Sequence, residues 1–147
     1  MYEGNKDCCK NEEYLTYKIT HILLIISSFI TTVTYSIAED HLKEENNLFV
    51  GWCLGSGVFA LTYGIFCLYI DLKRNVYFQR NHVTFLLFDF LIIFLLFSIS
   101  VSGSVLWKNG DNYGKNSFDT GNIFSWISLV IIIVITYQDY KQNEESL

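Results

Sequence analysis

Four long apolar blocks, almost free of charge, constrain this chain more than any other feature of its sequence. They cover residues 19–38, 48–70, 83–107 and 121–137. A bilayer core about 30 Å thick needs about 20 helical residues to cross it, so three blocks span it and the fourth, with about 17, only just does. Lipid offers the backbone no hydrogen-bond partner, so each span must be a helix. The chain, 51% hydrophobic and 17% charged, is therefore predicted to be an all-α membrane protein.

The connections between the blocks predict how the helices are arranged. With about 9, 12 and 13 residues they are too short to hold a further domain, so consecutive helices are expected to be antiparallel neighbours. The result is an antiparallel four-helix transmembrane bundle over residues 19–138. Residues 1–18 precede it as an N-terminal segment, and residues 139–147 follow it as a tail.

The first block is interpreted as a retained span rather than a cleaved signal peptide. Ser36-Ile37-Ala38 has the small-x-small pattern of a cleavage site. However, the preceding segment carries four acids against three lysines, and the apolar run is longer than the core of a typical signal peptide.

Basic residues predict the orientation of the bundle. Seven lie in the N-terminal segment, the second connection and the tail, whereas three lie in the first and third connections. The positive-inside rule then places both termini in the cytosol. The seven are Lys6, Lys10, Lys18, Lys73, Arg74, Arg80 and Lys141, and the three are Lys43, Lys108 and Lys115.

Glycines in the second block predict close helix packing, because small residues let helix backbones approach in lipid. Gly51 and Gly55 form a GxxxG pair, and Gly57 and Gly64 lie seven residues apart on one face. We expect the second span to be the central packing element of the bundle. Packing within one chain is favoured, and a homo-oligomer interface is the alternative.

Asp89, in the third block, is the one carboxylate inside a predicted span. An acid at that depth costs about 2.5–3.5 kcal/mol on insertion scales unless it is paired or neutralised. We predict a structural ion pair between Asp89 and Lys18, with His21, Tyr63 and Cys67 as other candidate partners. A proton or cation site at Asp89 is the less favoured reading.

The sequence contains few other residues or motifs that are typical of catalytic, metal-binding or modification sites. The sequence lacks a His-Glu-x-x-His motif, a Cys-x-x-Cys motif and a phosphate-binding loop, so we expect no catalytic residue, no metal site, no cofactor and no nucleic-acid partner. Cys8 and Cys9, about ten residues before the first span, are candidates for S-palmitoylation, and unmodified thiols are an equal alternative.

Short motifs in three spans resemble the MARVEL-type tetraspan vesicle proteins, and synaptogyrins in particular. The second span has Cys53-x-x-x-Gly57 and ends on residues 68–71, Leu-Tyr-Ile-Asp. The third opens with Phe-Asp-Phe at residues 88–90 and closes on Trp107. The fourth has Ile-Phe-Ser-Trp at residues 123–126 and Tyr-Gln-Asp-Tyr-Lys at residues 137–141. The resemblance covers about residues 15–141, and Lys18 matches the position of an arginine in that family.

The resemblance implies a non-enzymatic protein of secretory or synaptic vesicles that acts in membrane trafficking and regulated exocytosis. Its expected partners are the lipid bilayer and other vesicle membrane proteins. The tyrosine-rich tail of that family is missing, and so are the lumenal cysteines of its synaptophysin branch. An accessory subunit of a larger membrane complex is the alternative function, followed by a small channel or transporter.

Overall fold

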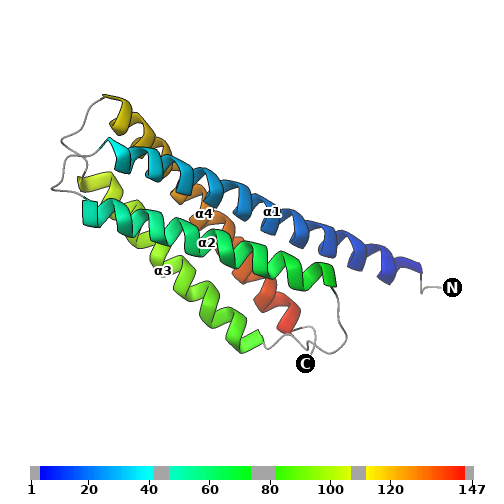
Figure 1. The fold of residues 1–147 in the computed structure, drawn as a ribbon. Coiled ribbons are helices and arrows are strands. Elements are labelled where there is room, and N and C mark those ends of the chain that lie inside the picture. The colour runs from blue at the N-terminus through cyan, green and yellow to red at the C-terminus, as the bar shows by residue number, and fades with distance from the viewer. Residues whose placement is uncertain (1–3, 42–46, 74–81, 107–111, 145–147) are drawn as a thin grey trace.

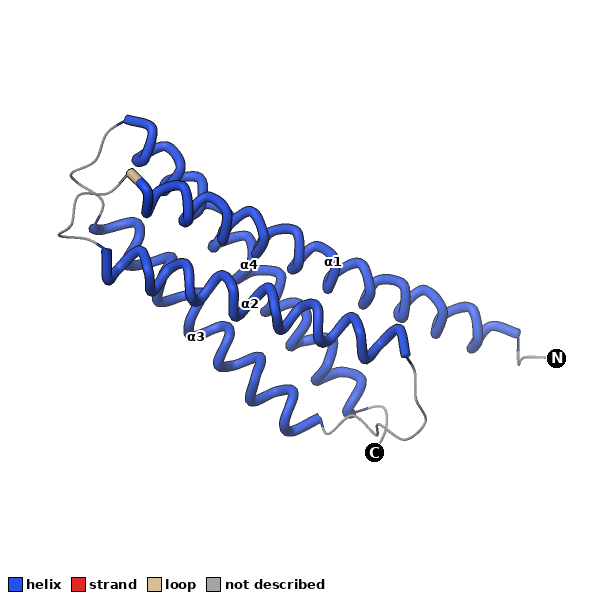
Figure 2. Tube along the Cα trace, in the orientation of Figure 1, coloured by secondary structure: helices blue, strands red, loops and turns tan. Residues whose placement is uncertain are grey.

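The computed structural model describes residues 4–41, 47–73, 82–106 and 112–144, and these residues form four helices (Figure 1). Helix α1 covers Gly4–Asp40, α2 covers Asn47–Lys73, α3 covers His82–Leu106 and α4 covers Asn112–Glu144. A single turn residue, His41, follows α1, and the described chain contains no strand (Figure 2). The helices pack as a bundle, which confirms the predicted all-α four-helix fold.

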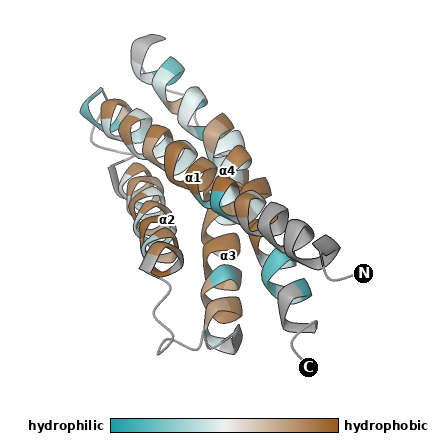
Figure 3. Cartoon of the chain, turned by 90° about the vertical axis from the view of Figure 1, so that its right-hand side faces the viewer, coloured by the Kyte–Doolittle hydropathy of each residue, from teal (hydrophilic) through white to brown (hydrophobic). Residues whose placement is uncertain are grey.

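All four helices are long and apolar enough to cross a membrane. The qualifying stretches are Lys18–Asp40, Phe49–Ile70, Thr84–Ser104 and Gly114–Lys141. Apolar residues dominate the length of the helices, and polar residues gather towards their ends (Figure 3). The chain is therefore an integral membrane protein with four spans, because lipid is the medium that such apolar surfaces require.

Helices α1 and α4 extend well beyond the predicted spans. Helix α1 begins at Gly4, inside the predicted N-terminal segment. Helix α4 begins at Asn112, so much of the connection expected at residues 108–120 is helical, and it continues to Glu144 within the predicted tail. The early start has a packing reason, because Phe118 is fully buried and its ring lies 5.4 Å from that of Tyr35 and 6.1 Å from that of Phe49. The fourth span is consequently not short.

Buried residues recur at alternating steps of three and four along every helix. This 3.5-residue repeat is the geometry of left-handed coiled coils, in which side chains of facing helices interdigitate layer by layer. The buried seams are 21, 24, 28, 31, 35 and 38 in α1; 50, 53, 57, 60, 64 and 67 in α2; 85, 89, 92, 96, 99 and 103 in α3; and 114, 118, 121, 125, 128, 132, 135 and 139 in α4.

Helices α1 and α4 form the centre of the bundle. Helix α1 packs extensively against both α2 and α4, α4 also packs against α3, and the contact between α2 and α3 is much the smallest of the four. The prediction that the second span is the central packing element is therefore wrong. Helix α2 is apolar on most of its circumference, so the part of its surface that does not pack against α1 or α3 suits contact with lipid.

The start of α1, the end of α2, the start of α3 and the end of α4 lie together, and we call this the termini end of the bundle (Figure 1). Large apolar side chains cover the outer surface between the two ends, among them Phe29, Phe66, Phe94 and Val130, each more than half exposed. In water such a surface would be costly, whereas in a bilayer it faces lipid tails.

Candidate functional site

Asp89 is fully buried in the core of the bundle, on the seam of α3. Its carboxylate oxygen Oδ1 accepts a hydrogen bond from the hydroxyl of Tyr63, which lies on α2. The Tyr63 ring also stacks on Phe88, with ring centroids 6.3 Å apart. Tyr63 was one of the candidate partners in the sequence, and its hydrogen bond supplies part of the stabilisation that a carboxylate needs at this depth.

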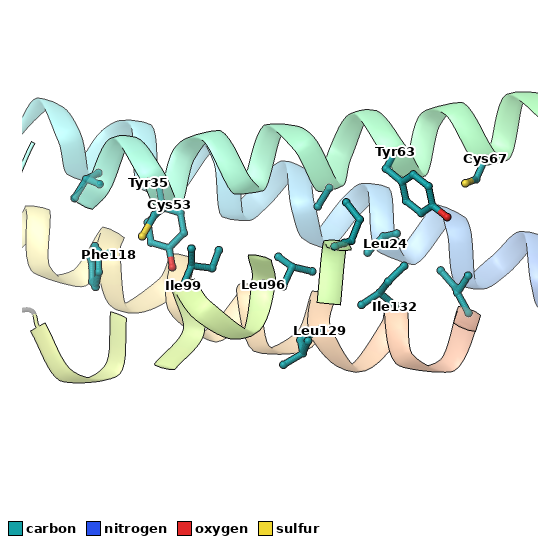
Figure 4. Close-up of a cluster of buried hydrophobic side chains, with 14 of the residues drawn as sticks. Leu24, Tyr35, Cys53, Tyr63, Cys67, Leu96, Ile99, Phe118, Leu129 and Ile132 are labelled. Atoms are coloured by element: carbon teal, nitrogen blue, oxygen red, sulfur yellow. The ribbon is translucent and has the colours of Figure 1, made fainter. Parts of the chain in front are cut away.

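Cys67 lies one helical turn beyond Tyr63, and its thiol interacts with the Tyr63 hydroxyl. Figure 4 shows that hydroxyl turned towards Cys67, with Leu24 of α1 and Ile132 of α4 at the neighbouring level of the core. His21 of α1, one turn from Leu24 on the same seam, is fully buried as well. An imidazole, a carboxylate, a phenol and a thiol are thus buried at the termini end of the bundle.

A second set of polar residues lies one turn closer to the termini. Asp139 of α4 is 4% exposed, although it belongs to the predicted tail. The neighbouring Gln138 accepts a hydrogen bond of 3.1 Å from the hydroxyl of Thr20 on α1. Lys18, two residues before Thr20, is half-buried. The predicted ion pair of Lys18 with Asp89 stays a prediction, and Tyr63 is one partner that the structure shows for Asp89.

Hydroxyl groups join neighbouring helices within the candidate membrane spans. Ser128 of α4 donates a hydrogen bond of 2.8 Å to Ser27 of α1, and the hydroxyls of Ser100 on α3 and Ser125 on α4 lie 2.7 Å apart. Each pair is buried. Interhelical hydroxyl bonds of this kind contribute about 0.6 kcal/mol on average in a membrane protein. They bind α4 to both of its neighbours without supplying a nucleophile next to a base.

The four glycines singled out in α2 divide into two pairs. A Cβ on Gly57 would lie 2.9 Å from Thr32 Oγ1, and one on Gly64 would lie 3.0 Å from Ile25 Cγ1, so both glycines allow α1 to approach closely. For Gly51 and Gly55 no described atom lies within 4 Å of a Cβ. The expectation that this GxxxG pair packs against another helix of the same chain is therefore wrong for the described residues. Gly51 and Gly55 lack such a packing contact because they lie off the buried seam of α2.

The candidate acylation sites Cys8 and Cys9 lie on the first turns of α1, and their side chains are outside the part of the chain that the structure describes. Palmitoylation stays a prediction. The two cysteines of α2, Cys53 and Cys67, are buried free thiols. Among the described residues no three histidine, cysteine or acidic side chains are grouped so as to hold a metal ion.

Sequence reasoning missed a close contact between helices α1 and α4. A Cβ on Gly121 of α4 would lie 2.8 Å from Thr34 Oγ1 and 2.9 Å from Tyr35 Cε1, so α4 and α1 are in near contact there. Gly121 has no GxxxG partner in the sequence, and its role was hidden by the polar residues around it. The seven-residue repeat of buried positions would have identified this contact. In that repeat Gly121 follows Phe118 and precedes Ser125 and Ser128.

Comparison of the chain with family models, with curated proteins and with solved structures finds no match. The four spans support a tetraspan membrane protein. The resemblance to synaptogyrins rests on the short motifs alone and stays a prediction.

Proposed function

We propose that this chain is a non-enzymatic tetraspan protein of secretory or synaptic-like vesicles, where it organises lipid and neighbouring membrane proteins during trafficking and regulated exocytosis. The observation that carries the proposal is the use of the buried polar side chains. Ser27 bonds to Ser128, Ser100 to Ser125, and Tyr63 to Asp89, so these groups join helices to one another. A bundle held together in this way is suited to a structural role in the membrane.

The positions of the resembling motifs support the same proposal. In the third span, Asp89 points into the bundle while Phe88 and Phe90 on either side of it are exposed to the surroundings. In the fourth span, Ser125 is buried against Ser100, and Trp126 beside it is 39% exposed and packs edge-on against Phe97. These two motifs thus combine an inward polar residue that joins helices with outward aromatic residues at the lipid surface.

Localisation of the full chain tests the proposal. The chain, tagged after Leu147, would be expressed in secretory cells and followed through density gradients with a vesicle marker and a mitochondrial marker. We expect it in the vesicle fractions and in vesicles captured with an antibody to the tag. Enrichment with the mitochondrial marker would refute the vesicle role and support the accessory-subunit alternative. A matched chain with Gly55→Ala, which changes no described packing contact, controls for effects of substitution on sorting.

Orientation is tested separately, because both termini are proposed to be cytosolic. In sealed microsomes, added protease should remove a tag at either terminus without detergent. If the tags are cleaved only after the membrane is opened, the proposed orientation is wrong.

A further inference from the structure

The contacts between helices define which residues share a layer at the termini end. On the α1–α4 side, Thr20 bonds to Gln138 and Ser27 to Ser128, so the antiparallel register sets His21 opposite Ile135. On the α3–α4 side, the contact between Ser100 and Ser125 fixes the antiparallel register in the same way. It sets Asp89 level with Ile135 and Thr136. His21 and Asp89 therefore occupy one layer of the bundle.

Helix α2 leads to the same layer by an independent route. Gly64 packs against Leu24 and Ile25 of α1, so Cys67, one seam position further on, lies level with His21. The Tyr63 hydroxyl contacts both Cys67 and the Asp89 carboxylate. Two chains of contacts, one through α4 and one through α2, thus place the buried imidazole and the buried carboxylate at the same level of the core.

We propose that His21 and Asp89 form a proton-binding pair, which holds one shared proton inside the membrane-embedded core. The ligand of this site is a proton. It resides either on a ring nitrogen of His21 or on a carboxylate oxygen of Asp89, and the pair is neutral overall in both arrangements. Tyr63 donates its hydrogen bond to the carboxylate and keeps its own proton.

Charge explains why the pair would hold a proton. Both side chains are 0% exposed, and an isolated buried ion costs several kcal/mol. One proton shared between an acid and a base removes that cost, whereas removal of the proton leaves a net negative charge in the core. The proposed pair would link protonation to the placement of α1 relative to α3, two helices that otherwise pack mainly through α2 and α4.

Among the side chains that the structure describes, the other titratable groups around the pair come from three helices. Lys18 of α1 lies one turn closer to the termini, Cys67 and Tyr63 of α2 lie beside the pair, and Asp139 of α4 lies one seam position beyond Ile135. Asp139 is an acid and Lys18 a base at the same level of the bundle, so their charges offset each other as seen from the pair. His21 is the group at this level whose ordinary titration falls in the physiological range.

Nuclear magnetic resonance of the full chain in lipid nanodiscs tests the proposal. Histidine labelled with nitrogen-15 would be incorporated into a His41→Gln, His82→Gln chain, so that the ring nitrogens of His21 are observed alone. We expect them to titrate at a midpoint at least about one pH unit away from that of His41, measured in a His21→Gln, His82→Gln chain. Equal midpoints would overturn the proposal, and this comparison leaves Asp89 intact.

A second comparison identifies the partner. Asp89→Asn should move the His21 midpoint and change its ring-nitrogen shifts, because the shared proton loses one of its two sites. Asp119→Asn, an exposed carboxylate on the same bundle far from His21, is the matched control and should change neither. If Asp89→Asn leaves the His21 titration as it is in the parent chain, the pair does not exist.

Discussion

Replacement of Gly121 by alanine should destabilise the bundle, because α4 packs closely against α1 at this glycine. The added Cβ would lie 2.8 Å from Thr34 Oγ1, 2.9 Å from Tyr35 Cε1 and 3.0 Å from Tyr35 Cδ1. Neither the Thr34 nor the Tyr35 side chain can move away easily. The Thr34 hydroxyl donates to the carbonyl of Ile30 at 2.8 Å, and the Tyr35 ring is fully buried against Phe118. The methyl group therefore forces the helices apart or pushes Tyr35 from its place.

The magnitude follows from two opposing effects. Overpacking of a tight core costs about 1–3 kcal/mol, while alanine in place of glycine favours a helix by about 1 kcal/mol. The second effect is shared by Gly55→Ala, whose Cβ meets no described atom within 4 Å. The difference between the two variants isolates the packing cost, so Gly121→Ala should be less stable than Gly55→Ala by about 1–3 kcal/mol.

Unfolding of both purified variants in mixed micelles, with increasing sodium dodecyl sulfate and tryptophan fluorescence as the signal, measures this difference. The wild-type chain is the common reference. If Gly121→Ala proved as stable as Gly55→Ala or more so, the close contact between α1 and α4 would be wrong.

Three further predictions use the same assay or a simple labelling reaction. Tyr63→Phe removes the hydroxyl bonded to a buried carboxylate and should cost about 1.5–3 kcal/mol, whereas Tyr69→Phe, at an exposed tyrosine of the same helix, should cost less than about 0.5 kcal/mol. Equal losses would contradict a special role for the buried hydroxyl. Ser128→Ala should cost about 0.6 kcal/mol, and a double-mutant cycle with Ser27→Ala should show coupling; additive effects would mean that the two hydroxyls do not bond. In a Cys8→Ser, Cys9→Ser chain, the two cysteines of α2 should react with a maleimide only after unfolding, and rapid labelling of that folded protein would contradict their burial.

Much of the fold could be predicted because it depends on composition over long windows. Blocks of about 20 apolar residues predict spans, and short connections predict antiparallel order, whichever side chains pack against each other. The same reasoning failed at residues 112–120, where Asn116, Ser117 and Asp119 suggested a loop. Burial of Phe118 on α1 and α2 overrides that local polarity and extends α4.

The candidate site was predicted in part. Burial of Asp89 and its need of a partner followed from the cost of a charge in lipid. The identity of the partner did not, because Lys18, His21, Tyr63 and Cys67 all lie near one end of the bundle in any antiparallel arrangement. The choice of Tyr63 depends on the register and the rotation of α2 relative to α3.

The sequence by itself determined that this protein lies in a membrane and crosses it four times as helices, since those properties follow from the number and length of its apolar blocks. Tertiary structure alone decided which helices are central, which glycines are contact points and which polar groups meet. These depend on how each helix is rotated about its axis. In lipid a uniformly apolar helix has no preferred side, so close packing and buried hydrogen bonds select the rotation.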